Sequence, residues 1–189
     1  MSEIIRTRRL RREYEKIVSE LSGNGYVSVE PIQGDPPWYY RVTYRLPGLV
    51  WDESSRRAVV SQRHVVDIVL PIGYPRQGPR CTMRTPIWHP NIGDYVCIGD
   101  FWSPGVTLVD IIVHIADMIQ YKSYNLASPV NKEAAVWARC NRKSFPVGSC
   151  SILLTSESAG NNEPEAQPAT RESNDDIDIS LGPVRHRRT

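Results

Sequence analysis

Apolar residues recur at helical spacing between residues 4 and 22. In a helix, five of these side chains would lie along one stripe that can pack against a core. Gly23-Asn24-Gly25 follows directly and predicts the end of the helix. We therefore expect an amphipathic helix over residues 4–22. The stripe comprises Leu10, Tyr14, Ile17, Val18 and Leu21.

The opposite face of this helix is strongly basic. One interpretation is a solvated helix face, and the other is a docking surface for an acidic partner. The sequence leaves both interpretations open. The basic residues are Arg6, Arg8, Arg9, Arg11, Arg12 and Lys16.

Runs rich in β-branched and aromatic residues follow, over residues 26–32, 38–46 and 58–70. A shorter strand is expected at residues 80–84. The polar segment 47–57 reads as a long hairpin connection. This order predicts a four-stranded antiparallel meander, and with the helices an α+β fold.

Residues 86–104 show no helical or strand period and are rich in proline, so we expect an ordered irregular segment. A helix then begins at the capping box formed by Thr107 and Asp110. Asn131 predicts the cap of another helix that reaches about residue 141. The apolar stripe of the first of these helices is Leu108, Ile111, Ile112, Ile115 and Ile119.

The composition changes near residue 148. Residues 156–178 hold seven acidic residues and one arginine among Ser, Asn and Pro, whereas the end of the chain is basic. We therefore expect one folded domain at residues 1–147 and a disordered tail at residues 148–189. The apolar segment 152–154 in this tail could dock on the domain.

The overall composition narrows the class of protein. The 189 residues are 40% hydrophobic and carry a net charge of +2, so no basic field indicates a nucleic acid or membrane partner. The chain shows no signal core and no stretch of about 20 apolar residues. The four cysteines lack the spacing of a disulfide framework. We expect a soluble, cytoplasmic protein with free thiols.

Candidate chemistry lies in the irregular segment, where Cys97 follows His89-Pro90-Asn91. A cysteine can hold an acyl group as a thioester, and an Asn amide can stabilise the charge that develops when that group moves. The alternative is that Cys97 is a small buried hydrophobic residue. His89 is either a base for Cys97 or a structural residue, and the rigid Pro90 favours the structural role.

The sequence also raises two alternative sites, a zinc site and the active site of a thiol hydrolase. Zinc would need ligands such as Cys81, His89 and Cys97, but no two of these have the short spacing of ordinary zinc sites. A thiol hydrolase with a Cys97–His89 pair would need an orienting third residue, and none stands out. We therefore predict no metal and no cofactor.

The order of motifs resembles the ubiquitin-conjugating enzymes over roughly residues 4–145. Five motifs in the same order carry the resemblance. They are Tyr74-Pro75 with Pro79, residues 87–92 (Ile-Trp-His-Pro-Asn-Ile), Val96-Cys97-Ile98, Trp102-Ser103-Pro104 and residues 129–135 (Pro-Val-Asn-Lys-Glu-Ala-Ala).

The resemblance implies the fold of that family and a role for each matched residue. Cys97 would accept the C-terminal carbonyl of a ubiquitin-like protein from an activating enzyme and pass it to an acceptor amine. Asn91 would stabilise the oxyanion or hold the active-site loop. His89, Pro90 and Trp102 would support the site. The first helix, through Arg8, Arg9 and Arg12, would dock on the activating enzyme.

Several positions depart from the family pattern. The gap from Asn91 to Cys97 is about two residues shorter than in most eukaryotic members. Ser128 stands at the gate position that is often acidic, and Asp100 is an alternative carboxylate. Arg76 and Gly105 stand where RING-type ligases usually find an aromatic and a small residue.

The short loop, and the apparent lack of the family's last helix, resemble stand-alone bacterial members more than eukaryotic ones. By analogy, that likeness implies neighbours such as an activating enzyme, a ubiquitin-like protein and a deconjugating peptidase, and a role in phage defence. The alternative functions are a non-catalytic binding module of the same fold and the thiol hydrolase.

Overall fold

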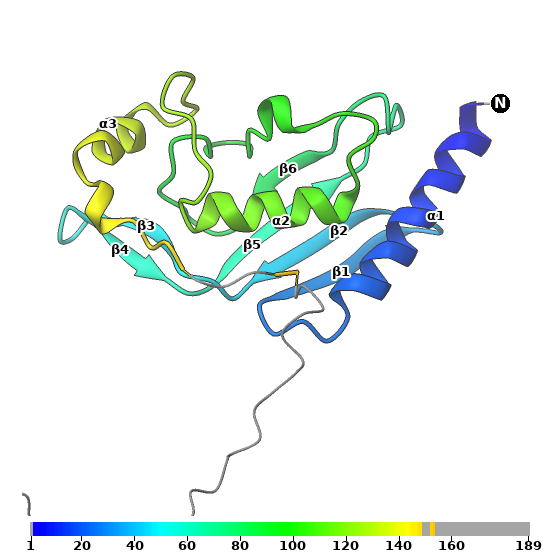
Figure 1. Ribbon diagram of the computed structural model, residues 1–189, viewed down its shortest axis with the longest axis horizontal. Helices are drawn as coiled ribbons and strands as arrows, with labels where there is room; N and C mark the ends of the chain where they lie inside the picture. Colours follow the sequence, from blue (N-terminus) through cyan, green and yellow to red (C-terminus); the bar gives the residue numbers. More distant parts are fainter. Residues whose placement is uncertain (1, 149–151, 154–189) are drawn as a thin grey trace, which may run out of the picture. The chain divides into compact units, whose positions relative to one another are not determined.

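An N-terminal helix, a four-stranded antiparallel sheet and two later helices make up the fold, as a computed structural model shows (Figure 1). The structure describes residues 2–148, 152 and 153, which lie within one unit, Met1–Thr155. The expected α+β class is confirmed. The helices are α1 (Ser2–Leu21), α2 (Leu108–Ile119) and α3 (Lys132–Cys140), and the strands are β1 (Val27–Gly34), β2 (Pro37–Tyr44), β3 (Gly48–Asp52), β4 (Arg57–Ser61), β5 (His64–Val69) and β6 (Arg80–Met83).

The main sheet has the order β1-β2-β5-β6, and each neighbouring pair is antiparallel. Val42 of β2 lies opposite Val29 of β1 and Val66 of β5. The prediction of a single strand at residues 58–70 was wrong, because these residues are divided between β4 and β5. The supposed connection 47–57 contains β3, which pairs with β4 as a separate two-stranded sheet.

Helix α1 contacts α2, β1 and β2 (Figure 1). Its buried stripe differs from the predicted one. Leu10, Ile17 and Leu21 are buried as expected, whereas Tyr14 and Val18 are 38% and 48% exposed. The stripe instead includes the carboxylate of Glu13, whose residue is only 2% exposed. Hydrogen bonds to that carboxylate offset the cost of its burial.

Helix α2 is the central core helix. The predicted capping box is confirmed, since Thr107 and Asp110 each accept a hydrogen bond from the other's backbone N–H. Eight of its residues are buried, which explains why its sequence is almost uniformly apolar. The hydroxyl of Tyr44 in β2 donates to the Ile112 carbonyl and joins the helix to the sheet.

Helix α3 lies with the β3–β4 hairpin at the far end of the fold from α1 (Figure 1). Asn131 caps it by accepting the Ala134 N–H at 2.9 Å, as predicted. Tyr121, Ala138 and Leu49 form a second small core there. The helix is thus held by its own cluster and by the irregular segment 86–104, because Val130 and Asn131 donate to the Pro90 carbonyl.

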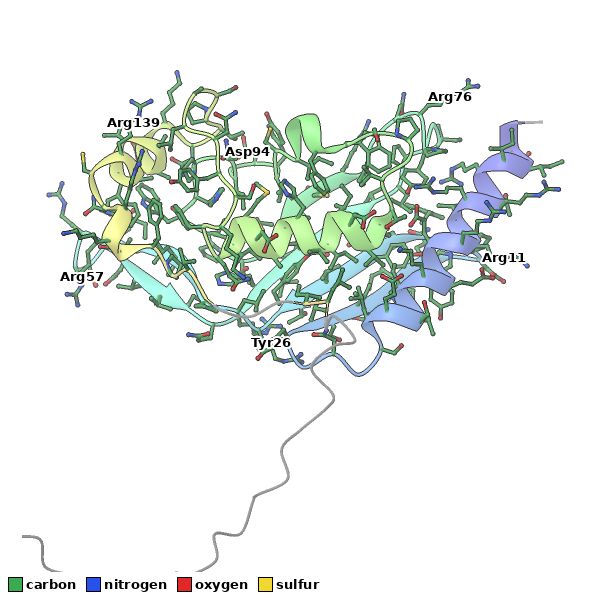
Figure 2. The ribbon with its side chains drawn as sticks, viewed as in Figure 1. Arg11, Tyr26, Arg57, Arg76, Asp94 and Arg139 are labelled. Atoms are coloured by element: carbon green, nitrogen blue, oxygen red, sulfur yellow. The ribbon has the colours of Figure 1, made fainter. Side chains whose placement is uncertain are left out.

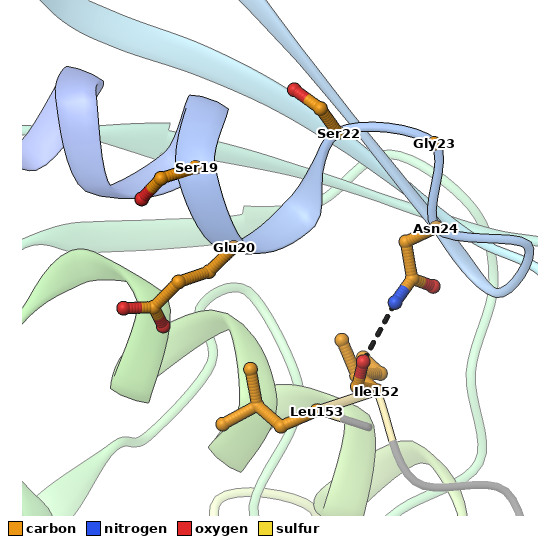
Figure 3. A pocket seen from close by; sticks show the side chains of 7 residues that line it. All are labelled: Ser19, Glu20, Ser22, Gly23, Asn24, Ile152 and Leu153. Atoms are coloured by element: carbon orange, nitrogen blue, oxygen red, sulfur yellow. Dashed lines mark hydrogen bonds between the residues drawn. The ribbon is translucent and has the colours of Figure 1, made fainter. Parts of the chain in front are cut away.

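The chain returns to the core at residues 152 and 153. Ile152 is buried, and its carbonyl accepts a hydrogen bond from the Asn24 side chain at 2.6 Å (Figure 3). Leu153 packs against the same core. The docking considered for this apolar segment is therefore observed at these two residues. The acidic and basic parts of the expected tail, and any last helix in it, lie outside the described residues.

Candidate active site

His89 is a buried anchor of the irregular segment. The residue is 0% exposed, and its Nδ1 accepts the Asn91 N–H at 3.1 Å. Its ring packs edge-on against Tyr121, with centroids 4.7 Å apart. Burial lowers the pKa of His89 to about 3, although the backbone of Ser123 partly opposes this effect. His89 is therefore a neutral structural residue near pH 7.

Asn91 joins the irregular segment to the loop after α2. Its Nδ2 donates to the carbonyls of Asn125 and Ser128 at 2.8 and 3.3 Å, and its Oδ1 accepts the Asn125 N–H at 2.6 Å. The residue is buried. Both amide hydrogens are thus already committed to backbone carbonyls. Of the two roles considered for Asn91, this geometry favours holding the loop.

Pro90 connects the same segment to α3. Its carbonyl accepts the N–H groups of Val130 and Asn131, both at 2.8 Å. Because Asn131 is the N-cap residue of α3, the start of that helix is fixed against Pro90. Pro90, Asn91 and His89 therefore each tie the segment to a different part of the fold.

Cys97 lies where the segment turns back along Asn91. Its N–H donates to the Asn91 carbonyl at 2.9 Å, and the preceding Val96 N–H donates to the Cys81 carbonyl at 2.8 Å. Cys97 is a partly exposed free thiol, whereas Cys81 is buried in the core. The interpretation of Cys97 as a fully buried hydrophobic residue is therefore wrong.

A cavity of about 320 Å³ opens beside Cys97. One wall comes from the active-site segment, one from α2 and one from the loop that Asn91 holds. His89 is not among the lining residues, so the geometry does not build a Cys97–His89 pair. The lining residues are Asn91, Cys97, Ile98, Gly99, Phe101, His114, Met118, Ser123, Tyr124, Asn125 and Ser128.

His114 of α2 was missed in the sequence. Its ring is half-buried and stacks on Phe101, with centroids 4.0 Å apart and planes 5° from parallel. The residue lies in a mostly apolar helix, where a single histidine at an intermediate position was the available signal. Only the fold shows that this position faces the Cys97 cavity.

Trp102 supports the other end of the segment. Its ring lies 5.5 Å from that of Tyr74, between centroids, in a tilted arrangement. A Cβ on Gly78 would approach the Trp102 ring to 2.8 Å, so the indole is closely packed against that turn. These contacts join the Tyr-Pro turn to the Trp-Ser-Pro turn and fit the supporting role expected of Trp102.

The structure describes the side chain of Ser128 but not that of Asp100. Ser128 is exposed and lines the cavity, while its carbonyl accepts from Asn91. Asp100 lies in a short 3-10 helix, Gly99–Phe101, but its side chain is outside the described residues. A hydroxyl orients a partner but is not a base near neutral pH.

The three arginines expected to dock on an activating enzyme are not equivalent. Arg8 and Arg12 are exposed. Arg9 instead donates to the carbonyls of Pro104 and Val106 at 2.9 and 2.6 Å, and pairs with Glu13 at 2.5 Å. The Arg9 side chain therefore has a structural role within the fold. Arg11 on α1 and Arg76 both extend at this end of the molecule (Figure 2).

The placement of His, Cys, Asp and Glu side chains decides whether the described residues could hold a metal ion. Within residues 2–148, 152 and 153, no group of three or more His, Cys, Asp or Glu side chains is placed to hold a metal ion. The Cys81 thiol is enclosed by the core, and burial raises its pKa to about 12, which makes it a poor zinc ligand. No helix in this part of the chain is long and apolar enough to cross a membrane.

The arrangement presents an accessible thiol on an anchored loop. A free, partly exposed cysteine can exchange acyl groups as thioesters, provided that a carbonyl carbon can reach the sulfur. The adjoining cavity offers room for a second reactant. The buried anchors of the loop fix where the sulfur lies before any reactant arrives.

Comparison with known proteins found one family model and one similar protein. Residues 61–148 match the family model described as "Ubiquitin-conjugating enzyme". The protein "Ubiquitin-conjugating enzyme E2 27" of Arabidopsis thaliana is 32% identical over an alignment 88 residues long, and this alignment covers 43% of this chain and 43% of the plant protein. The similarity thus spans less than half the length of that relative.

The arrangement of helix, four-stranded sheet and two later helices is consistent with the ubiquitin-conjugating fold. Neither comparison supports the likeness to bacterial members or the role in phage defence that the short loop implied. The matched segment includes every residue that lines the Cys97 cavity. By sequence, residues 61–148 of this chain are similar to the ubiquitin-conjugating enzyme family.

Proposed function

We propose that the whole chain acts as a ubiquitin-conjugating enzyme that carries a ubiquitin-like protein on Cys97. The observation that supports this proposal is the accessible Cys97 thiol beside a cavity, on a loop held by His89, Pro90 and Asn91. The family similarity of residues 61–148 adds the substrate class.

In the first step, the Cys97 thiolate attacks the thioester that joins the ubiquitin-like protein to an activating enzyme. A new C–S bond forms on Cys97, and the activating enzyme's thiolate leaves. In the second step, an acceptor amine attacks the same carbonyl carbon, and Cys97 leaves as the thiolate. The chain itself needs no cofactor for either exchange, because ATP is used by the activating enzyme.

Asn91 has a positioning role in this proposal. Its two amide hydrogens donate to Asn125 and Ser128, so it holds the loop that forms the far wall of the cavity. Ser128, on that loop, would help to orient the acceptor amine. Asn91 acts on the reaction through this wall rather than as a free oxyanion donor.

The partners follow from the reaction and from the charge of α1. The exposed Arg8 and Arg12 would meet an acidic surface of the activating enzyme, while Arg9 stays bound to the fold. Arg76 in place of an apolar anchor disfavours RING-type ligases. An acceptor protein and a deconjugating peptidase complete the expected pathway, in a cytoplasm that keeps Cys97 reduced.

A charging assay tests the proposal. The chain is mixed with ubiquitin, a ubiquitin-activating enzyme and ATP, and the protein products are separated by electrophoresis without reductant. We expect a one-to-one adduct that a thiol reductant removes. Cys97→Ala should abolish it, and Cys97→Ser should give a reductant-resistant ester. The exposed Cys140 provides the matched control, because Cys140→Ala should charge normally. An adduct that survives in Cys97→Ala contradicts the proposal.

A further inference from the structure

The Cys97 cavity contains a histidine to which the proposed reaction has so far given no role. We propose that His114 accepts the proton of the incoming amine when the acyl group leaves Cys97. This inference rests on the proposed function, because it assigns a base to the second step of that reaction.

His114 and Cys97 line the same cavity. His114 projects from α2 into this cavity. Stacking on Phe101, at 4.0 Å between centroids, fixes the plane of its ring. Among the described residues, neither nitrogen of this ring takes part in a hydrogen bond or an ion pair. The imidazole is therefore held in place by one face while its nitrogens stay available.

The other polar groups of the cavity are less suited to the task. The Asn91 amide is committed to the loop, and Asn125 accepts the Ala127 N–H through its side-chain oxygen at 2.8 Å. The Ser128 hydroxyl and the Tyr124 phenol are weak bases near neutral pH. Among the described side chains that line the cavity, His114 alone carries an imidazole, the group whose basicity suits proton transfer near neutral pH.

The charge state of His114 suits a proton acceptor. Burial lowers its pKa from the ordinary value, and Asp117, one turn further along α2, partly opposes this effect. Asp117 also lies 3.9 Å from the ammonium of Lys122. His89 is the other nearby titratable group, and it is neutral. Cys97 and Tyr124 face the ring across the cavity. The imidazole is therefore neutral at pH 7.

The transfer of the acyl group from Cys97 to the amine needs no further reagent. The amine nitrogen attacks the thioester carbonyl carbon and forms the C–N bond. The C–S bond breaks, and its electron pair leaves on the sulfur of Cys97 as the thiolate. The surplus proton on nitrogen passes to His114, and the resulting imidazolium returns it to that thiolate. The products are an amide and the free thiol.

A small acyl group allows this role to be tested without an activating enzyme. The full chain is acetylated at Cys97 by exchange with S-acetyl-N-acetylcysteamine. Loss of the Cys97-bound acetyl group to free lysine is then followed by peptide mass spectrometry from pH 4.5 to 8.5. Each rate is divided by the fraction of lysine present as the free amine. The same measurement without lysine gives the background loss of the acetyl group by hydrolysis.

We expect the corrected rate of the wild type to rise as His114 loses its proton below about pH 6.5 and to be level above it. His114→Gln should lower the level rate about 10²-fold, the lower end of the range for general bases, and remove the rise. His114→Phe keeps an aromatic ring against Phe101 but cannot accept a proton, so it should behave like His114→Gln.

Three outcomes overturn the proposal: a profile shared by the wild type and both variants, a His114→Phe variant that matches the wild type, or a Cys97 that takes up no acetyl group. The charging assay with ubiquitin stands apart from this test. If Cys97 is never charged there, but acetyl transfer depends on His114, the proposed function fails and the assignment of His114 as a base holds.

Discussion

Two halves of the active-site segment are built in opposite ways. Residues 88–92 are anchored, since His89, Pro90 and Asn91 are all tied to other elements and His89 and Asn91 are buried. Residues 97–101 are open, because Cys97 is partly exposed and Phe101 is 40% exposed. One half therefore fixes the position of the thiol, while the other leaves it accessible.

The largest effect is expected where the anchored half is broken. Asn91→Ala leaves the Asn125 N–H and two carbonyls without their partner. A buried hydrogen-bonding group without a partner costs about 1–3 kcal/mol. Because water can reach some of these three groups, we expect the free energy of unfolding to fall by about 3 kcal/mol in total. Urea unfolding followed by tryptophan fluorescence measures this change.

Ser128→Ala is the matched control, because it removes a side chain at an exposed position of the same loop. It should change the free energy of unfolding by less than about 0.5 kcal/mol. If both substitutions cost the same, Asn91 is not an anchor and the two halves of the segment are alike.

A smaller loss of stability is expected when the pH is lowered and His89 of the anchored half tends to bind a proton. The pKa of His89 is lowered to about 3 in the folded chain, whereas an unfolded histidine has a pKa of about 6.5. The unfolded state therefore binds more protons below pH 6.5, and stability falls as the pH drops from there toward 3. From pH 7 to pH 5, His89 should contribute a loss of about 2 kcal/mol.

His89→Asn isolates this contribution, because Asn can still accept a hydrogen bond but does not titrate. The variant should lose about 2 kcal/mol less than the wild type between pH 7 and pH 5, in parallel urea titrations. The buried His64, whose pKa is also lowered, is present in both proteins and cancels from the difference. Equal losses would mean that His89 is not held neutral by burial.

The smallest effect is expected in the open half. Gly99 has a φ of +47°, and a Cβ there would meet nothing within 4 Å. Gly99→Ala should therefore cost about 1 kcal/mol through backbone conformation alone. Gly105→Ala is the control, because it has ordinary φ and no neighbour closer than 3.9 Å, and it should cost nothing. A loss well above 1 kcal/mol for Gly99→Ala would show tight packing in a half described as open.

Elements with strong local signals were predictable. The caps of α2 and α3 depend on Thr107, Asp110 and Asn131, which act within one helical turn, and all are confirmed. Local chemistry also predicted that His89 is structural, because a rigid proline follows it. These features need only the residues next to them in the sequence.

Features that depend on distant partners were not predictable. The β-rich run 58–70 gives no sign of the break that separates β4 from β5, since both halves favour strand. Glu13 reads as a surface residue until Tyr74 and the Leu108 N–H are placed beside it. His114 likewise acquires meaning only when α2 brings it to the Cys97 cavity.

The Glu13 carboxylate has a practical consequence for any mutational study of α1. It accepts hydrogen bonds from Arg9, Tyr74 and the Leu108 N–H at the start of α2. Reversing the charge of Arg9 would therefore loosen the junction of α1, the Tyr-Pro turn and α2. A charge-reversal scan of α1 reports on partner affinity only at outward positions such as Arg8 and Arg12.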